Sequence, residues 1–249
     1  MRKRLLFIAG GGVALLGLAI AAVVAVWLLR SDDPNLLTSA PTITAGTATP
    51  AASATAAPAG VTPAAVSLPA GVRRFVVVPQ ESLAKFVVEE TLRGLDATAV
   101  GTTSDVSGEL YLTKDGLYKD LPSVFKVDLR TLKTDESLRD GAIRDRALQT
   151  SRFPFAEFKV EAVTGFPTSY VEDVEVQLTL SGTMTIHGVS KPLTFTVKAR
   201  QLGNTLGATA DAEFKMTDFD VTPPEFPGVA KAKDGVLLQI VLIARELGF

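Results

Sequence analysis

Residues that could carry catalysis or bind a metal are few in this chain. Its 249 residues include no cysteine and a single histidine, His187. Cysteine-based redox chemistry, disulfides and zinc or iron–sulfur sites are therefore excluded, and so is a multi-histidine metal site. His187 stands beside Gly188 at the end of an alternating segment, where we expect an exposed turn residue rather than a catalytic base. The sequence predicts no catalytic residue, no metal site and no cofactor.

Two pairs of adjacent carboxylates, Glu89-Glu90 and Asp135-Glu136, are the remaining candidates for acid–base chemistry. Adjacent residues of a strand point to opposite faces, and adjacent residues of a loop are normally solvated, so we expect neither pair to form a site. Residues 136–148 are rich in Arg and Asp and predict a short surface helix that ends before Pro154. Its charges (Arg139, Arg144, Arg146, Asp140, Asp145) are expected to pair at the surface.

The elements that must position any site alternate with a period of two. Residues 174–186 alternate apolar and polar side chains without a break, which indicates one long strand or two joined by a bend at Gly182. A turn over residues 187–192 follows, and the alternation continues over 193–200 and 208–216. Residues 236–244 are apolar on both faces except Gln239, so we expect the outer face of this strand to be covered.

Shorter alternating segments precede these, at residues 84–88, 110–112 and 125–129. About eight strands with one polar face each predict an all-β fold, either a closed antiparallel barrel or a sandwich. An eight-stranded barrel is wide enough to hold one small ligand or to be filled by its own side chains. The sequence pattern leaves both choices open.

The apolar faces of these strands supply the candidate ligand-binding wall. Its members share only an inward position and an aliphatic, aromatic or thioether side chain, and their alternative role is a dry core. They are Phe86, Leu110, Phe125, Val127, Leu129, Leu178, Leu180, Met184, Phe195, Val197, Phe214, Met216, Leu238 and Ile240.

The first 30 residues predict a transmembrane anchor with a short basic cytoplasmic N-terminus. Residues 5–29 carry no charge, and as a helix they would be roughly 37 Å long, enough for a hydrocarbon core of about 30 Å. Three basic residues precede the run, which favours export of everything that follows. The alternative is a cleaved signal peptide, whose apolar region is usually shorter, at most about 15 residues.

Residues 31–72 read as a linker. Ala, Thr, Pro, Ser and Gly dominate from residue 38 to residue 70, and no apolar period emerges. Such a stretch buries too little surface to offset its ordering entropy, so the sequence predicts a disordered stalk. The remaining residues, 73–249, form the expected β domain. The chain's 25 basic and 27 acidic residues are nearly balanced, which argues against nucleic-acid binding.

Several segments of the β domain resemble the YceI-like family of exported lipid-binding proteins. Residues 78–86 (VPQESLAKF) are similar to the opening strand of the family, and residues 127–135 (VDLRTLKTD) with 153–158 (FPFAEF) to its middle section. Residues 180–193 (LSGTMTIHGVSKPL) carry the strongest likeness. The opening differs at Glu81-Ser82, where the family commonly has His-Ser, and residues 216–219 lack the arginine that often precedes Asp-Phe.

The resemblance implies a lipocalin-like antiparallel barrel, with a short helix, around an apolar pocket for a polyisoprenoid chain. We therefore expect a non-enzymatic protein that binds, carries or stores a quinone or prenyl lipid at the outer face of the cytoplasmic membrane. As an alternative to pairing with acidic residues at the surface, Arg139, Arg144 and Arg146 could receive the head group of such a lipid at the pocket mouth. A structural or interaction module with a self-filled barrel is the alternative, and secretion after signal cleavage is the alternative location. The protein partner is unknown.

Overall fold

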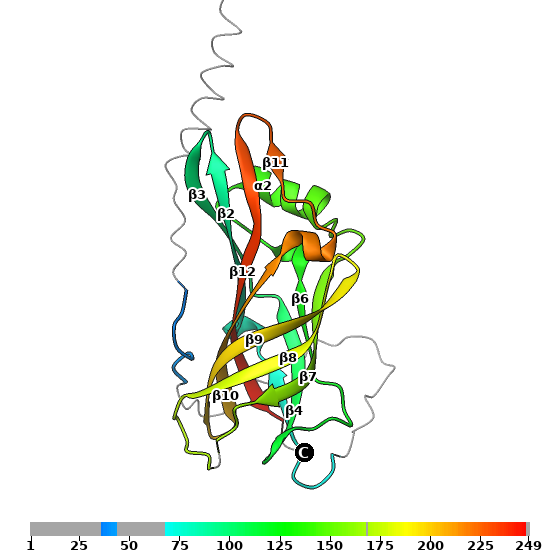
Figure 1. The fold of residues 1–249 in the computed structure, drawn as a ribbon. Coiled ribbons are helices and arrows are strands. Elements are labelled where there is room, and N and C mark those ends of the chain that lie inside the picture. Colours follow the sequence, from blue (N-terminus) through cyan, green and yellow to red (C-terminus); the bar gives the residue numbers. More distant parts are fainter. Residues whose placement is uncertain (1–35, 44–67, 168, 248–249) are drawn as a thin grey trace, which may run out of the picture.

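A computed structural model describes residues 36–43, 68–167 and 169–247, and it shows a tall antiparallel β-barrel (Figure 1). Its strands are β1 (Arg73–Val77), β2 (Leu83–Leu92), β3 (Leu95–Thr103), β4 (Val106–Thr113), β5 (Gly116–Leu117), β6 (Val124–Asp128), β7 (Phe155–Thr164), β8 (Val176–Ile186), β9 (Val189–Leu202), β10 (Thr205–Lys215), β11 (Glu225–Phe226) and β12 (Ala230–Glu246). Its helical elements are η1 (Pro79–Glu81), η2 (Leu129–Thr131), α2 (Ser137–Ala142), η3 (Ile143–Ala147) and η4 (Met216–Phe219).

The last strand closes the barrel. One edge of β12 pairs with β10, and its other edge pairs first with β2 and then with β1. β1 and β2 form one arm of a long hairpin and β3 and β4 form the other, since β2 pairs with β3 and β1 with β4. These two arms, together with β6, β7, β8, β9, β10 and β12, make an eight-stranded ring in which every strand is antiparallel to its neighbours. The closed barrel, rather than the sandwich, is therefore confirmed.

The alternation of residues 174–186 corresponds to one uninterrupted strand, β8, which begins at Val176. Gly182 is required there by close packing, because a Cβ at this position would lie 2.1 Å from the carbonyl oxygen of Lys159. The register of β7 against β8 shifts between Val160 and Ala162, so the irregularity lies in the neighbouring strand. Of the two alternatives, one long strand is therefore correct, and no bend at Gly182 divides β8.

The turn between β8 and β9 is shorter than the predicted segment 187–192. His187 and Gly188 alone form it, with φ angles of 53° and 78°, which are typical of a two-residue hairpin turn. β9 begins at Val189, and Pro192 pairs with Thr183 inside the ladder. The proline misled the prediction because it is usually excluded from the middle of a sheet.

Residues 36–43, which we name the strap, lie along the outside of the barrel and are drawn in blue in Figure 1. They fall inside the stretch expected to be disordered, yet Ala40 and Ile43 are buried against the wall. The strap covers Gln239, in agreement with the expected cover over this strand. Residues 1–35 and 44–67, which hold the predicted anchor and most of the predicted linker, lie outside the described residues. No helix among the residues described is long and apolar enough to cross a membrane.

Candidate ligand-binding cavity

The barrel encloses a cavity of about 500 Å³. This volume lies within the range of about 300–1,000 Å³ that is usual for small-molecule sites. All fourteen residues of the candidate wall line it, from Phe86 on β2 to Ile240 on β12. A barrel filled by its own side chains would leave no such space. Contact of these residues with a ligand stays a prediction.

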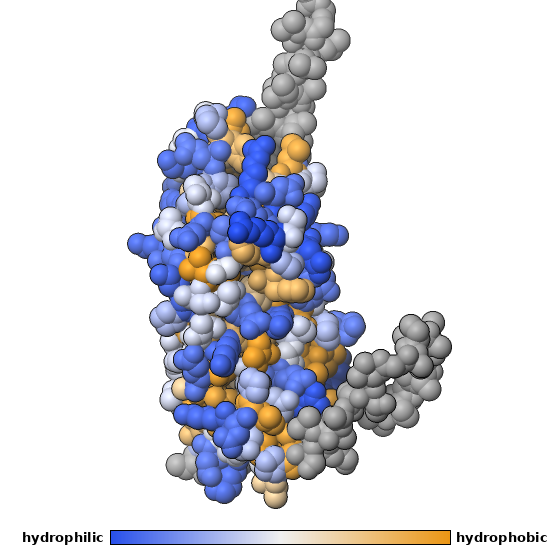
Figure 2. Space-filling model, turned by 90° about the vertical axis from the view of Figure 1, so that its right-hand side faces the viewer, coloured by the Kyte–Doolittle hydropathy of each residue, from blue (hydrophilic) through white to orange (hydrophobic). Residues whose placement is uncertain are grey.

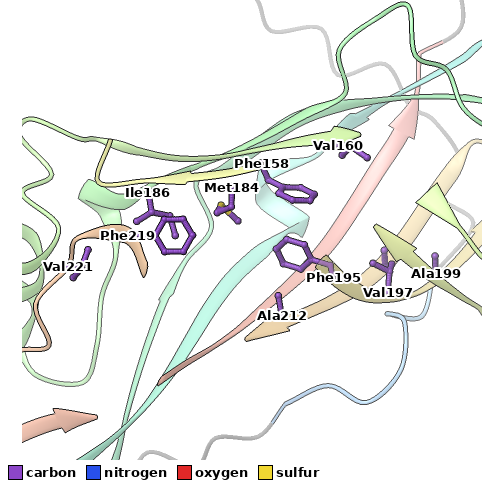
Figure 3. Packing of buried hydrophobic residues seen from close by; sticks show 11 residues of the cluster. Phe158, Val160, Met184, Ile186, Phe195, Val197, Ala199, Ala212, Phe219 and Val221 are labelled. Atoms are coloured by element: carbon purple, nitrogen blue, oxygen red, sulfur yellow. The ribbon is translucent and has the colours of Figure 1, made fainter. Parts of the chain in front are cut away.

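Inward residues of β7, β8 and β9 build one side of the cavity. Figure 3 shows their side chains directed into the barrel from facing strands. The rings of Phe158 and Phe195 meet edge to face with centroids 4.9 Å apart, and Met184 is buried in the same cluster. A second cluster around Phe75 and Leu110 packs where β1, β4 and β12 meet. The strand alternation therefore produces a continuous apolar lining.

Apart from Leu129 and Met216, the sequence prediction missed the part of the lining that comes from outside the strands. Leu138, Ala142, Ile143 and Ala147 reach the cavity from α2 and η3. They recur at intervals of four, one and four residues, which places them on one helical face turned towards the cavity. This spacing could have predicted from the sequence that the helix lines the cavity. At the opposite end, Tyr170 lines the cavity from the loop between β7 and β8, where no sequence period exists.

A buried ionic cluster lies at the α2 end of the cavity. Arg139 and Glu90 both line the cavity, and their side chains are only 12% and 8% exposed. An Nη atom of Arg139 donates a hydrogen bond of 3.2 Å to Glu90, and its other Nη atom donates to Asp135. The surface location predicted for this arginine is therefore wrong, because α2 packs over the barrel end and buries it.

The two members of each carboxylate pair, Glu89-Glu90 and Asp135-Glu136, lie in different surroundings, as expected. Glu89 is exposed and pairs with Lys233 at 2.7 Å; the hydrogen bond from this ammonium lowers the pKa of the Glu89 carboxyl. Glu90 points to the opposite face, into the barrel. Glu136 accepts a hydrogen bond from the backbone N–H of Leu138 at the start of α2. Neither pair is arranged as a two-carboxylate site.

His187 occupies the predicted turn but is not exposed. Its imidazole packs edge-on against the ring of Phe153, with centroids 4.6 Å apart, and both ring nitrogens are buried. It does not line the cavity. The expected exposure was wrong because the loop before β7 folds back over the turn, a contact that local sequence does not reveal.

Comparison with known proteins gives this barrel a family. The model of the YceI-like domain matches residues 75–244. The chain belongs to the YceI-like family. No curated protein sequence matches it.

Two solved structures share the YceI-like fold described above. A polyisoprenoid binding domain from Saccharophagus degradans, implicated in plant cell wall breakdown, is 15% identical with a TM-score of 0.56, and the match covers 70% of this chain and 98% of that one. BcnA from Burkholderia cenocepacia is 16% identical with a TM-score of 0.54, over 67% of this chain and 98% of that one. At these identities the likeness concerns the fold.

Charged lining is confined to few positions of this YceI-like cavity. Glu90, Glu136 and Arg139 stand at the α2 end, Arg200 stands at the other end, and Lys85 lies on β2. Arg200 contacts Asp173 at 3.5 Å and Glu175 at 3.4 Å. The long wall between the two ends is almost entirely aliphatic and aromatic. Its chemistry suits an elongated apolar molecule.

Proposed function

We propose that this protein binds an isoprenoid lipid, either a quinone or a prenyl lipid, inside its barrel. The observation that carries the proposal is the cavity of about 500 Å³ inside the barrel, whose lining is nearly all apolar. Membership of the YceI-like family supports it, as does the fold shared with a polyisoprenoid binding domain.

The physical match is between a wall without charge and a tail without charge. Each CH₂ group that leaves water for such a cavity contributes about 0.8 kcal/mol. Affinity therefore grows with the length of tail that the cavity covers, and no specific polar contact is needed along it. Met184 and Met216 adapt their shape to an irregular branched chain.

The proposed role is carriage or storage rather than catalysis. The charged groups at the α2 end of the cavity, Arg139 and Glu90, are engaged with each other. A tail that leaves a bilayer would enter the barrel by partition and would leave it in the same way.

We place the barrel at the outer face of the cytoplasmic membrane, tethered by residues 1–30. The basic start and the long uncharged run of that segment support this location. Release after cleavage of a signal peptide is the competing location.

Lipid mass spectrometry of the full-length protein tests the ligand. The protein is purified from its native membrane in mild detergent and extracted with organic solvent, and a detergent blank is extracted beside it. One prenyl species near one molecule per chain is the expected result. A chain that remains empty after incubation with quinones and prenyl phosphates would refute the proposal.

A further inference from the structure

The strap is fixed to the barrel by hydrogen bonds along its length. The backbone N–H of Leu37 donates to Oε1 of Gln239 at 2.9 Å, and Nε2 of Gln239 donates to the carbonyl of Leu37 at 3.0 Å. The hydroxyl of Thr209 donates to the carbonyl of Ser39 at 2.9 Å. The N–H of Ala40 donates to Glu175 at 2.8 Å, so these contacts span two strands, β12 and β10, and the loop before β8.

The barrel wall is built to receive this segment. Gln239 and Thr209 are 2% and 1% exposed, although they are polar and point outwards from the barrel. Burial of such groups is costly unless they are hydrogen-bonded, and the strap supplies partners for both. Pro41 and Ile43 lie over Gly207, where an added Cβ would approach them to 3.2 and 3.1 Å. The strap is therefore an integral part of the outer wall.

The strap has a defined direction along the barrel. Leu37 bonds to Gln239, whereas Ile43 lies over Gly207, whose partner on β12 is Ile243. The strap thus runs towards the C-terminal end of β12. The α2 end of the barrel is the opposite one, because Glu90, which contacts α2, pairs with Ala232 near the start of β12. The first residues of the strap therefore lie nearer to the α2 end than its last residues do.

Only a short piece of chain separates the strap from the uncharged apolar run of residues 5–29. Six peptide steps join Arg30, which ends that run, to Leu36, and they span at most about 20 Å when extended. The nine residue-to-residue steps from Ala230 to Gln239 rise about 23 Å along a barrel whose strands tilt by about 40°. The six steps therefore reach the neighbourhood of the α2 end.

The α2 end carries exposed apolar side chains. Leu138 and Leu95 are 73% and 66% exposed, and Phe226 and Val229 are more than one third exposed. The N–H of Arg93 donates to the carbonyl of Val229 at 2.9 Å, which joins the β2–β3 turn to the β11–β12 turn. Leu138, Phe226 and Val229 also line the cavity, so they edge its mouth.

Exposed apolar residues alone do not select this end, because Tyr170 and Val171 are exposed at the other. Figure 2 likewise shows apolar atoms near both ends of a mostly hydrophilic surface. The direction of the strap makes the choice. We propose that the strap holds the barrel with its α2 end against the bilayer, so that Leu95, Leu138, Phe226 and Val229 enter the lipid head-group region and the cavity opens onto the membrane. This inference rests on the membrane tether of the proposed function.

The absence of cysteine makes the test direct. Full-length Leu95→Cys and Val171→Cys variants are each labelled with one fluorophore and reconstituted into phosphatidylcholine–phosphatidylglycerol vesicles that contain a lipid with a nitroxide quencher on its head group. Both positions are more than half exposed and neither lines the cavity, so the two variants are matched. We expect the label at position 95 to lose most of its fluorescence and the label at position 171 to keep it.

Two variants of the barrel wall test whether the strap causes the proposed orientation. Gly207→Leu places a side chain where Pro41 and Ile43 pack, and Gln239→Ala removes both hydrogen bonds to Leu37. In the Leu95→Cys and Val171→Cys backgrounds, either change should abolish the difference between the two labels, with folding checked by circular dichroism. A difference that persists in folded Gly207→Leu and Gln239→Ala proteins would overturn the role of the strap.

Equal quenching at both positions, stronger quenching at position 171, absence of quenching, or a chain that does not stay with the vesicles would each overturn the orientation. Lipid extraction of the same samples keeps this outcome separate from the ligand. Bound prenyl lipid without a difference between the labels refutes the orientation alone. A clear difference in an empty barrel supports the orientation and refutes the ligand.

Discussion

At the scale of single residues, the cavity combines an extended apolar wall with one buried ionic cluster. The guanidinium of Arg139 lies between Glu90 and Asp135, and all three side chains are at most 15% exposed. Such clusters often add little net stability. Removal of one partner nevertheless lowers the free energy of unfolding strongly, because it leaves an unpaired charge in a poorly solvated environment. The cluster therefore acts as a constraint on how α2 sits over the barrel end.

Replacing Arg139 by Met should destabilise the protein by about 3 kcal/mol, because Glu90 and Asp135 lose a shared cation. Urea unfolding monitored by circular dichroism measures the change. Arg144→Met is the matched control: this arginine is more exposed and lies 4.0 Å from Asp140, so its loss should cost less than about 1 kcal/mol. Addition of Glu90→Gln to Arg139→Met should recover part of the loss. Equal stability of the two arginine variants would contradict the cluster's role.

Leu180→Asp should abolish lipid binding, because a carboxylate would face the apolar path of the tail. Lipid bound per chain after purification is the measurement. Gln177→Asp is the control, since Gln177 is exposed on the same strand and does not line the cavity. A folded Leu180→Asp protein with undiminished lipid would show that the ligand lies elsewhere.

At the scale of elements, ion pairs hold β1 to both of its neighbours in the barrel, β12 and β4. Arg73 on β1 donates two hydrogen bonds to Glu246 on β12, at 3.0 and 2.6 Å, and these bonds lower the pKa of the Glu246 carboxyl. Arg74 lowers the pKa of Glu109 on β4 in the same way. Both edges of β1 are therefore tied by charge as well as by the backbone ladder.

This arrangement predicts a pH-dependent contribution to stability. A carboxyl whose pKa is lower in the folded than in the unfolded state stabilises the fold above its unfolded pKa, near 4.3, and the contribution is lost as the pH falls through the folded pKa. Glu246→Gln should therefore cost up to about 1 kcal/mol at about pH 7 and almost nothing at about pH 2. Unfolding free energies of variant and wild type at both pH values give the comparison. A cost that does not shrink in acid would contradict the ion pair.

The elements differ in how readily the sequence revealed them. The alternation of the strands, clearest in β8 and β9, indicates which residues face inwards, and all fourteen candidates line the cavity. The apolar face of α2 and η3 could have been predicted from its helical spacing, but its apolar residues are few among many charged ones. The strap was not, because Ala, Thr and Pro have no apolar period, and its order comes from polar groups of β10 and β12 far away in the sequence.

At the scale of the whole molecule, the proposed lipid binding predicts a protein whose stability depends on whether the cavity is filled. A ligand that binds only the folded state at about one hundred times its Kd adds about 2.7 kcal/mol, which for a domain of this size raises Tm by about 5 °C or more. Extraction of the lipid should therefore lower Tm by that amount, and adding it back should restore it. The Leu180→Asp variant should show no shift on either step. Identical melting of loaded and extracted wild type would contradict a ligand enclosed by the barrel.

The place of β12 in the chain sets the order of events during synthesis. Apart from β12, each strand of the ring pairs with a strand that is close to it in the sequence. Hairpins can therefore form one after another as the chain emerges. The ring is completed only when residues 230–246 arrive and join β10 to β1 and β2. Until then the apolar wall is an open, curved sheet with no interior. Under the proposed function, a lipid can be bound only after residues 230–246 have joined the sheet, so a chain that lacks this strand would be made but never filled.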